Sequence, residues 1–514
     1  MGAGETCPLF CKKEDIALKR ILCARRMKAC DKKEIVTRTP SGVLMMRAGQ
    51  AVYSVLKESF DVSKVLFVCG GGNNGGDGLI AAMLSAAEGN EAHVLFVGSD
   101  KGCTDECAKR LAEAKKTSVK FVSEISDGYT AIVDAMFGIG LSRNIDGDNA
   151  LIIGEINQSG APVLSVDIPS GICADNGEVL GCAVYADVTV TIAAYKRGLV
   201  MGDGAEYAGR IVCVDVGIPC DEADLCEGVD WQVPYVYEKS DLSLLPKRPR
   251  VCNKGTFGRV LVIGGAPGMC GAVYLSALAA YRCGAGIVEI VTSNENRLPL
   301  QVLLPEAIVT AVDWEKPDYE DMGCALGRAY NICIGPGMGM SEGALKILEF
   351  VYKNAGSAIT VDADALNLTA KHSLEFPRQV SVTVTPHPME LSRLTGLDID
   401  EIKADHWEIA SDYASEHNIV CVAKDAFTAV TDGDELFVNV CGSPALAKGG
   451  SGDVLSGAVT ALRGLGLAPL KAACLATLIH GLAGEAAAER YGESAPLARE
   501  TADLMGVVLK EANR

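Results

Sequence analysis

The chain alternates short apolar runs with longer stretches that suit helices. In the first half, the apolar runs cover residues 65–69, 93–97, 131–134, 162–167, 188–193 and 211–216. Such uninterrupted apolar runs are typical of parallel strands that helices cover on both faces. The pattern therefore predicts an α/β domain, with helices over residues 21–31, 43–56 and 79–87.

The same alternation restarts in the second half, after an acidic and irregular connector. Strand-like runs there cover residues 260–263, 287–291, 332–334, 359–361, 380–384 and 419–423. Residues 428–431 and 435–440 flank Asp432-Gly433, a dipeptide that is typical of a β-hairpin turn. The sequence thus predicts two α/β domains, residues 1–225 and 246–514, joined by a linker over residues 226–245.

Composition limits the classes of partner. The chain has 66 acidic and 47 basic residues, and its net charge of −19 disfavours nucleic acid and anionic membranes as partners. Its 20 cysteines are scattered and none forms a CxxC pair, which indicates reduced thiols in a cytoplasmic protein. No run approaches the roughly 18 apolar residues that a membrane span needs.

A glycine-rich stretch, Gly449-Gly450-Ser451-Gly452, precedes Asp453 and an apolar, helix-compatible run over residues 454–462. A flexible loop that opens a helix presents unpaired N–H groups, which suit a phosphate or a developing oxyanion. A carboxylate in the first helical turn is placed to take a proton from a hydroxyl. The motif alone fits equally well a simple glycine turn before a core helix.

Polar residues also gather at predicted strand ends in the first half. Gly70–Gly78 contains Asn73 and Asn74 and follows one strand, while Asp134 and Asp167 end two others. In open α/β sheets, ligands bind at the carboxyl ends of the strands. Carboxylate, amide and hydroxyl oxygens there suit a hard cation, although an isolated strand-end Asp is more often a helix cap.

The first half resembles the NAD(P)H-hydrate epimerases. The matching stretches are Leu44–Gly49, Asn73–Gly78, Asp134–Gly140 and Val166–Gly171, and the resemblance covers about residues 22–220. It implies a Rossmann-like α/β/α domain that interconverts the R and S forms of NADH or NADPH hydrated at nicotinamide C6. This chain departs from the family in having Gly70-Gly71-Gly72 where Gly-Asn-Gly is usual.

The resemblance also implies roles for individual residues. It implies a potassium ion held by Asn74, Asp134 and Ser170, and catalytic roles for Asp167 and Lys196, although a surface lysine is an equal alternative for Lys196. The substrate contacts that it implies are Asn73, Asn74, Gly75, Gly76, Asp77, Gly138, Ile139, Gly140, Leu141, Ser142, Arg143, Asn144 and Asp167.

The second half resembles the ADP/ATP-dependent NAD(P)H-hydrate dehydratases, which belong to the ribokinase-like superfamily. The blocks that carry this resemblance are Lys254–Gly258, Ala279–Gly286, Gly335–Gly339, Asp362–Asn367, Thr385–Glu390 and Gly442–Gly457. Only the Gly-Ser-Gly-Asp loop is shared with kinases of the superfamily in general. Enzymes of this family phosphorylate the C6 hydroxyl of the S hydrate and then eliminate phosphate.

The second resemblance implies Asp453 as the catalytic base. The implied contacts to the hydrated dinucleotide are Gly337, His387, Pro388, Met389, Glu390 and Asp453. The implied contacts to ADP or ATP are Lys424, Asp425, Ala426, Phe427, Thr428, Gly449, Gly450, Ser451 and Gly452. The family commonly has Lys-Gly where this chain has Lys424-Asp425, so the choice between ADP and ATP stays open.

Together the two halves predict a bifunctional enzyme that repairs hydrated NADH and NADPH. We expect Mg²⁺ with ADP or ATP, a K⁺ ion, a homo-oligomer and a cytoplasmic location. The alternative is a ribokinase-like vitamin or sugar kinase fused to a domain that only binds a nucleotide or a protein partner. The shared superfamily loop alone leaves that alternative open, whereas the Gly335–Gly339 and His387–Glu390 stretches favour the dehydratase.

Overall fold

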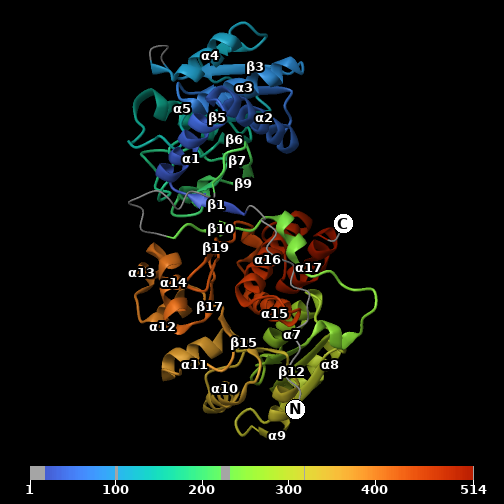
Figure 1. Ribbon diagram of the computed structural model, residues 1–514. Coiled ribbons are helices and arrows are strands. Elements are labelled where there is room, and N and C mark those ends of the chain that lie inside the picture. The colour runs from blue at the N-terminus through green and yellow to red at the C-terminus, as the bar shows by residue number, and fades with distance from the viewer. Residues whose placement is uncertain (1–17, 99–101, 221–231, 318, 513–514) are drawn as a thin grey trace. The chain divides into compact units, whose positions relative to one another are not determined.

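The structure of the protein, a computed structural model, describes residues 18–98, 102–220, 232–317 and 319–512. The chain forms two compact units, Met1–Val233 and Pro234–Arg514 (Figure 1). Of the predicted linker, residues 226–231 lie outside the described residues. Part of the rest folds into the short strand β10 (Tyr235–Val236) and the 3₁₀ turn η4 (Lys239–Leu244).

The first unit is built on a parallel sheet with the strand order β4-β3-β2-β5-β6-β7-β9. The strands are β2 (Lys64–Cys69), β3 (Glu91–Phe96), β4 (Lys120–Val122), β5 (Ala131–Ala135), β6 (Val163–Val166), β7 (Val188–Ile192) and β9 (Arg210–Val214). A separate parallel pair joins β1 (Lys19–Leu22) and β8 (Tyr195–Lys196). The prediction of a parallel α/β sheet is confirmed.

Helices cover both faces of this sheet. They are α1 (Ala24–Thr37), α2 (Ser41–Ser59), α3 (Asn73–Ala87), α4 (Asp105–Ala114), α5 (Gly147–Gln158) and the single turn α6 (Gly204–Tyr207). Along β2, Val65 and Phe67 pack with α2, α3 and α4, whereas Leu66 and Val68 pack with α5. This period of two explains why the strands read as continuous apolar runs: both of their faces are buried.

The second unit has a mixed sheet. Its strands follow the order β13-β12-β11-β14-β15-β16-β17-β18-β19-β10. Their bounds are β11 (Arg259–Ile263), β12 (Ile287–Ser293), β13 (Ile308–Val312), β14 (Asn331–Ile334), β15 (Ala358–Val361), β16 (Val382–Val384), β17 (Val420–Ala423), β18 (Ala429–Thr431) and β19 (Leu436–Val438). The strands from β13 to β17 are parallel, and β18 and β19 form the predicted antiparallel hairpin.

Helices also surround the second sheet. Four of them, α7, α15, α16 and α17, pack against one another (Figure 1). The helices are α7 (Cys270–Arg282), α8 (Arg297–Leu303), α9 (Tyr319–Arg328), α10 (Glu342–Asn354), α11 (Asp364–His372), α12 (Pro388–Thr395), α13 (Ile399–Ala404), α14 (His406–His417), α15 (Ser451–Gly464), α16 (Pro469–Tyr491) and α17 (Ala498–Ala512). Among the described residues, none of the helices combines the length and apolar character needed to cross a bilayer.

Two local predictions were wrong. The predicted helix over residues 21–31 begins instead as strand β1, and α1 starts at Ala24. Residues 73–78, predicted as loop, form the first turns of α3. Their glycines allow close packing: a Cβ on Gly75 would lie 1.8 Å from the Gly70 carbonyl oxygen, and one on Gly78 would lie 2.6 Å from the Ala135 Cβ.

Candidate active sites

The predicted residues of the first unit lie where neighbouring parallel strands end. The turn Gly70–Gly72 follows β2, Asp134 lies in β5, Asp167 and Ser170 follow β6, and Lys196 lies in β8 shortly after β7. Because β2, β5, β6 and β7 are adjacent and parallel, their carboxyl ends share one edge of the sheet. Four segments that are distant in sequence therefore meet there.

Asp134 organises this edge through its fully buried carboxylate. One carboxylate oxygen accepts the Ser170 hydroxyl at 2.6 Å and the Met136 N–H at 3.2 Å, and the other accepts the Ser165 hydroxyl and the Ser170 N–H, both at 2.8 Å. Burial raises the pKa of Asp134, and these four hydrogen bonds oppose that shift. Asp134 thus joins β5 to the segment after β6, as a structural cap would.

Asn74 and Ser170 meet on the backbone of Phe137. The Asn74 Nδ2 donates to the Phe137 carbonyl at 3.1 Å, and the Ser170 Oγ accepts the Phe137 N–H at 2.9 Å. The buried Asn74 Oδ1 has no hydrogen-bond partner among the described residues. An unpaired buried amide oxygen beside a hydroxyl and a carboxylate is a donor set that suits a hard monovalent cation.

Lys196 is buried, not a surface lysine. Its Nζ donates to the Asp167 carboxylate, to the Thr191 hydroxyl at 3.0 Å and to the Ile192 carbonyl at 2.7 Å. Asp167 has a backbone φ of 67°, a left-handed conformation that costs a non-glycine residue of order 1–3 kcal/mol. The strained backbone and the buried ion pair fix the carboxylate at the sheet edge.

Further carboxylates face this ion pair. Burial raises the pKa of Asp77 well above its ordinary value, and the Asp167 and Asp31 charges raise it further. Burial and the Asp167 charge also raise the pKa of Asp31, in α1. Sequence analysis included Asp77 but missed Asp31, because Asp31 lies in an amphipathic helix outside every matching motif.

The other predicted contacts of the first unit are more dispersed. Asn73 lies exposed at the start of α3 and accepts the Thr104 hydroxyl at 2.9 Å. Gly138 lies against Asn74, whose Cγ would be 3.3 Å from a Cβ placed there. Gly75 and Gly76 are buried in α3, Ile139 and Leu141 are half-buried, and the exposed remainder is Gly140, Ser142, Arg143 and Asn144.

In the second unit, Gly337 follows β14, His387–Glu390 follows β16 and Lys424–Thr428 follows β17, and these parallel strands end at one edge of the sheet, whereas the glycine loop precedes α15. Lys424 lies at the centre. Its Nζ donates to Asp362 Oδ1 at 2.8 Å and lies 3.8 Å from Glu390 Oε2, and a Cβ placed on Gly452 would be 3.2 Å from it. Burial lowers the pKa of Lys424, but the charges of Asp362, Glu390 and Asp453 outweigh it and raise the pKa overall.

Asp453 and Glu390 are carboxyl groups that titrate near neutrality. Burial raises the pKa of Asp453 to about 7, and the Asp362 charge adds to this while Lys424 opposes it. Burial likewise raises the pKa of Glu390 to about 7. Two neighbouring carboxyls with pKa values near neutral pH are typical of acid–base chemistry.

The glycine loop carries the free N–H groups that its sequence predicts. Gly450 has φ 96°, and α15 starts at Ser451, which places Asp453 in the first turn. Among the described residues, no hydrogen bond uses the N–H of Gly449, Gly450 or Gly452, whereas the Ser451 N–H donates to the Lys448 carbonyl at 3.2 Å. The start of this helix therefore carries unpaired donors, and Gly452 lies close to Lys424.

The His387–Glu390 segment caps α12. His387 Nδ1 accepts the Glu390 N–H at 3.3 Å, and the Glu390 carboxylate accepts the His387 N–H at 2.9 Å. Pro388 and Met389 begin the helix, and Met389 is exposed. On the other side of Lys424, Asp425 to Thr428 form a turn in which the Thr428 hydroxyl donates to the Asp425 carbonyl at 3.0 Å; Ala426 and Phe427 lie within it.

Sequence analysis gave no site role to three residues of this site, although two of them, Asp362 and Asp364, lie in the matching stretch Asp362–Asn367. Asp362 accepts from Lys424 and from the Thr385 hydroxyl, and Asp364 accepts the Gly339 N–H at 2.8 Å, next to the predicted Gly337. Both follow a strand, so the strand-end rule that selected Asp134 applies equally to them. His480 of α16 is buried with Nε2 unpaired, and burial and Lys424 lower its pKa to about 4; no sequence signal marks it.

Known proteins match the chain in both units. A family model described as NAD(P)H-hydrate dehydratase matches residues 260–504, and one described as YjeF-related protein N-terminus matches residues 41–198. The bifunctional NAD(P)H-hydrate repair enzyme of Coxiella burnetii is 36% identical over 467 residues, which cover 89% of this chain and 92% of that one. The Escherichia coli enzyme is 35% identical over 463 residues, 89% of this chain and 87% of that one.

A solved structure also matches part of the chain. The ADP/ATP-dependent NAD(P)H-hydrate dehydratase from Bacillus subtilis, co-crystallised with ATP/Mg²⁺, is 30% identical. It covers 56% of this chain and 100% of that one, with a TM-score of 0.49.

The chain belongs to the family of bifunctional NAD(P)H-hydrate repair enzymes. It is an NAD(P)HX epimerase and an ADP/ATP-dependent NAD(P)HX dehydratase, where NAD(P)HX denotes hydrated NADH or NADPH. The predicted function is confirmed, and the alternative of a vitamin or sugar kinase fused to a non-catalytic domain is set aside.

Proposed function

We propose that the dehydratase reaction takes place around Lys424 at the strand-end edge of the second unit. The observation that carries this proposal is the position of the half-buried Lys424, which lies beside the glycine loop with its unpaired N–H groups and close enough to Asp453 for their charges to interact. Asp453 accepts the proton of the substrate's C6 hydroxyl as that oxygen attacks the terminal phosphoryl group. Elimination of the phosphate from C6, together with a proton from the neighbouring ring carbon, then restores the double bond of the dihydronicotinamide ring.

The glycine loop binds the transferring phosphoryl group in this proposal. The N–H groups of Gly450 and Gly452 donate to its oxygens, and Ser451 joins only if its N–H leaves the Lys448 carbonyl. Lys424 adds a positive charge beside the loop. Carboxylates of Asp362, Asp364 and Asp453 are oxygen donors of the type that Mg²⁺ prefers, and Mg²⁺ bound with the nucleotide would neutralise phosphate charge.

The two substrates of the dehydratase flank these groups. We assign Gly337 and the segment His387, Pro388, Met389 and Glu390 to the hydrated dinucleotide. We assign Lys424, Asp425, Ala426, Phe427, Thr428 and the glycine loop to ADP or ATP. Asp425 carries a carboxylate at a position where the family commonly has a glycine. This residue therefore affects the preference between ADP and ATP.

We propose that epimerisation takes place at the strand-end edge of the first unit. Asp167, held by Lys196 and by its strained backbone, takes the proton of the C6 hydroxyl so that the bond between C6 and the ring nitrogen breaks and leaves an open aldehyde. Lys196 stabilises the negative charge that develops, and C6 is inverted when the nitrogen closes on the other face of the carbonyl and Asp167 returns the proton to its oxygen. The turn after β2, the start of α3 and the Gly138–Asn144 loop contact the rest of the substrate. Asp77 and Asp31 border this pair.

We propose K⁺ as the cation beside this site. The unpaired Oδ1 of Asn74 supports it, together with the hydroxyl of Ser170 and the carboxylate of Asp134. These ligands carry one formal charge and no sulfur or imidazole, which suits a weakly charged hard ion. The ion would orient substrate oxygens beside Asp167.

The division of labour follows the two units. We propose the epimerase within residues 1–225, a linker over residues 226–245 and the dehydratase within residues 246–514. We also propose a homo-oligomer in the cytoplasm. Free thiols on buried positions such as Cys69, Cys333 and Cys421 support the reducing compartment.

Incubation with mixed NADHX epimers tests these assignments, with dihydronicotinamide absorbance as the readout. We expect no recovery without nucleotide, complete recovery with ADP or ATP and Mg²⁺, and faster conversion of the R epimer in K⁺ than in Na⁺. Recovery that ends when the S epimer is consumed would contradict the epimerase assignment. Equal R conversion in the two salts would contradict the K⁺ site.

A further inference from the structure

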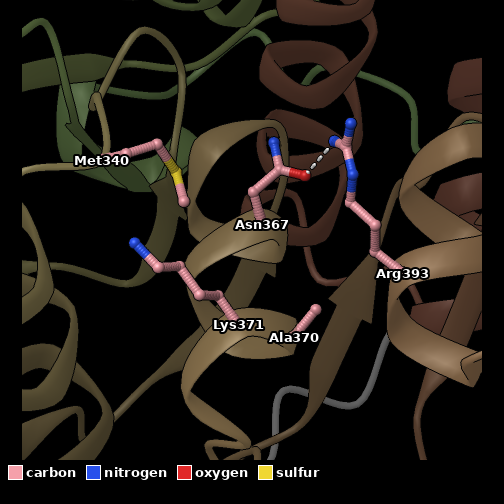
Figure 2. A pocket seen from close by; sticks show the side chains of 5 residues that line it. All are labelled: Met340, Asn367, Ala370, Lys371 and Arg393. Carbon is pink, nitrogen blue, oxygen red and sulfur yellow. Dashed lines mark hydrogen bonds between the residues drawn. The ribbon is translucent and has the colours of Figure 1, made fainter.

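A cavity of about 530 Å³ lies in the second unit and has no role in the account above. Its walls are Met340, Asn367, Ala370, Lys371 and Arg393 (Figure 2). The volume falls within the range of small-molecule sites, roughly 300–1,000 Å³.

Three elements connect the walls of the cavity to the proposed dehydratase site. Asn367 and Lys371 lie on α11, which starts at Asp364. Arg393 lies on α12, one turn beyond Glu390. Met340 directly follows Gly339, whose N–H binds Asp364. Burial and the Lys424 charge lower the pKa of His387, and the Arg393 charge lowers it further, which agrees with this proximity.

Charge makes this cavity unusual in an acidic protein. The neighbouring site contains the carboxylates of Asp362, Glu390 and Asp453. Two of these, Asp362 and Glu390, already form ion pairs with Lys424. In contrast, the Arg393 guanidinium donates at 2.6 Å to the neutral Asn367 side chain, toward which it is turned in Figure 2. Within the described residues, Lys371 makes no ion pair or hydrogen bond.

A dinucleotide carries phosphate groups that need such partners. Every hydrated dinucleotide has a pyrophosphate, and the hydrated form of NADPH has an additional phosphate on its adenosine ribose. Arginine and lysine are the common protein ligands of phosphate, arginine through its planar fork and lysine through its point charge. The carboxylates around Lys424 repel phosphate groups. Positive charges outside this carboxylate cluster, such as those of Lys371 and Arg393, are therefore needed to bind them.

We propose that the Lys371–Arg393 cavity is a phosphate subsite of the dehydratase, which binds a phosphate ester of the hydrated dinucleotide while its nicotinamide end lies at His387–Glu390 and Asp453. This inference rests on the proposed placing of the dinucleotide at His387–Glu390. Asn367 orients the guanidinium through its side-chain carbonyl, and the apolar side chains of Met340 and Ala370 form the remaining walls.

Steady-state kinetics of Arg393→Gln and Lys371→Gln in the full-length protein test the subsite, with pure S-NADHX and S-NADPHX at saturating ADP. We expect Arg393→Gln to raise KM by about 10- to 100-fold and to change kcat by less than about threefold, because the lost charge-assisted contact serves binding alone. Lys371→Gln should raise KM by about fivefold. Arg393→Lys should recover part of the loss.

The two substrates distinguish the two phosphate sources. A rise in KM for S-NADPHX alone assigns the cavity to the ribose phosphate, and an equal rise for both substrates assigns it to the pyrophosphate. Unchanged KM values for both substrates overturn the inference, whatever happens to kcat. Within the described residues Lys371 makes no ion pair or hydrogen bond, so its replacement should not disturb the fold. Lys371→Gln therefore tests the phosphate subsite even if Arg393→Gln fails to fold.

Matched controls separate this inference from the proposed function. Arg378→Gln removes an exposed arginine whose ion pair is with the exposed Glu375, and it should leave both KM values unchanged. If KM is unchanged in the cavity variants but rises in Glu390→Gln, the subsite alone is wrong. If Glu390→Gln also leaves KM unchanged, the placing of the dinucleotide is wrong.

Discussion

At the scale of single residues, the pKa of Asp453 is set by opposing influences, because this half-buried carboxyl lies among other carboxylates and near a lysine. Burial and the Asp362 charge both favour its protonated form, yet Lys424 keeps the ionised form within reach of neutral pH. A base of this kind is strong enough to take a hydroxyl proton and remains unprotonated in about half of the molecules at pH 7.

Asp453→Asn should remove dehydration and spare epimerisation. The amide keeps the shape of the carboxylate but cannot accept the hydroxyl proton, so we expect a loss of about 10²- to 10⁴-fold in dehydratase kcat. Epimerase activity, measured by interconversion of the NADHX epimers, should equal that of the wild type. Dehydration at the wild-type rate would contradict the assignment.

Stability provides a control for this variant. Because the pKa of Asp453 is higher in the folded than in the unfolded chain, the folded state binds more protons between about pH 4 and 7 and loses stability as pH rises through that window. The neutral asparagine avoids this loss. At pH 8 the variant should therefore melt no earlier than the wild type, so that lost activity cannot be attributed to unfolding.

Dehydratase activity should depend on pH through these carboxyls. We expect kcat/KM to rise with pH and to level off above an apparent pKa of about 7, because the ionised form of Asp453 is the base. Glu390 also has a pKa of about 7, so the profile reports the pair. In Glu390→Gln the midpoint should move to lower pH, since the Glu390 charge helps to raise the pKa of Asp453.

Measurements of kcat/KM between pH 5.5 and 9 check this expectation. A midpoint that stays in place in Glu390→Gln would show that the two carboxyls do not interact. Epimerase activity in the same buffers controls for effects on substrate or folding.

At the scale of elements, the sequence predicts strands better than it predicts helix starts. Strands such as β2 and β14 are buried on both faces, so their apolar runs are unmistakable. The edge strand β4, with the sequence Lys-Phe-Val, is largely exposed and carries no such run. The two-residue strands β8 and β10 are shorter than any pattern that periodicity can detect.

The start of α3 shows why the glycines were misinterpreted. Asn-Asn-Gly-Gly-Asp-Gly has low helix propensity, and propensity alone predicts a loop. Tertiary packing decides otherwise, because the helix lies against the Gly70 turn and strand β5 so closely that no side chain fits at Gly75 or Gly78. The sequence shows which residues are small enough for such a contact, but not how closely the helix approaches the turn and the strand.

Gly75→Ala should therefore destabilise the first unit, and Gly72→Ala should not. The new Cβ at Gly75 would lie 1.8 Å from the Gly70 carbonyl oxygen, a rigid backbone atom, whereas one at Gly72 would meet nothing within 4 Å. We expect a loss of more than about 3 kcal/mol in unfolding free energy for Gly75→Ala and less than about 1 kcal/mol for Gly72→Ala. Denaturant unfolding of the two variants measures this, and equal stabilities would contradict the packing argument.

At the scale of the whole molecule, most motifs of both sites could be predicted because they follow strands of a parallel sheet, and the glycine loop could be predicted because it begins a helix. Their mutual contacts could not be, since the pairing of Lys424 with Asp362 joins residues 62 positions apart. The same limit applies to the buried pair of Lys196 with Asp167, for which a surface lysine was an equal alternative. The strand-end rule finds candidates, and only the fold decides which of them meet.

The two activities should be separable between molecules, because the residues of each proposed site come from one compact unit. Spontaneous hydration gives both epimers, so complete repair needs both reactions but not one chain. Full-length Asp167→Asn should convert the S epimer and then stall at the spontaneous rate of epimerisation. Full-length Asp453→Asn should interconvert the two epimers but dehydrate neither. Mixed together with ADP and Mg²⁺, the two variants should restore all of the dihydronicotinamide absorbance, at a rate that rises with the concentration of the Asp453→Asn partner. A mixture that stalls where Asp167→Asn alone stalls would mean that the hydrate must pass between the two sites of one chain.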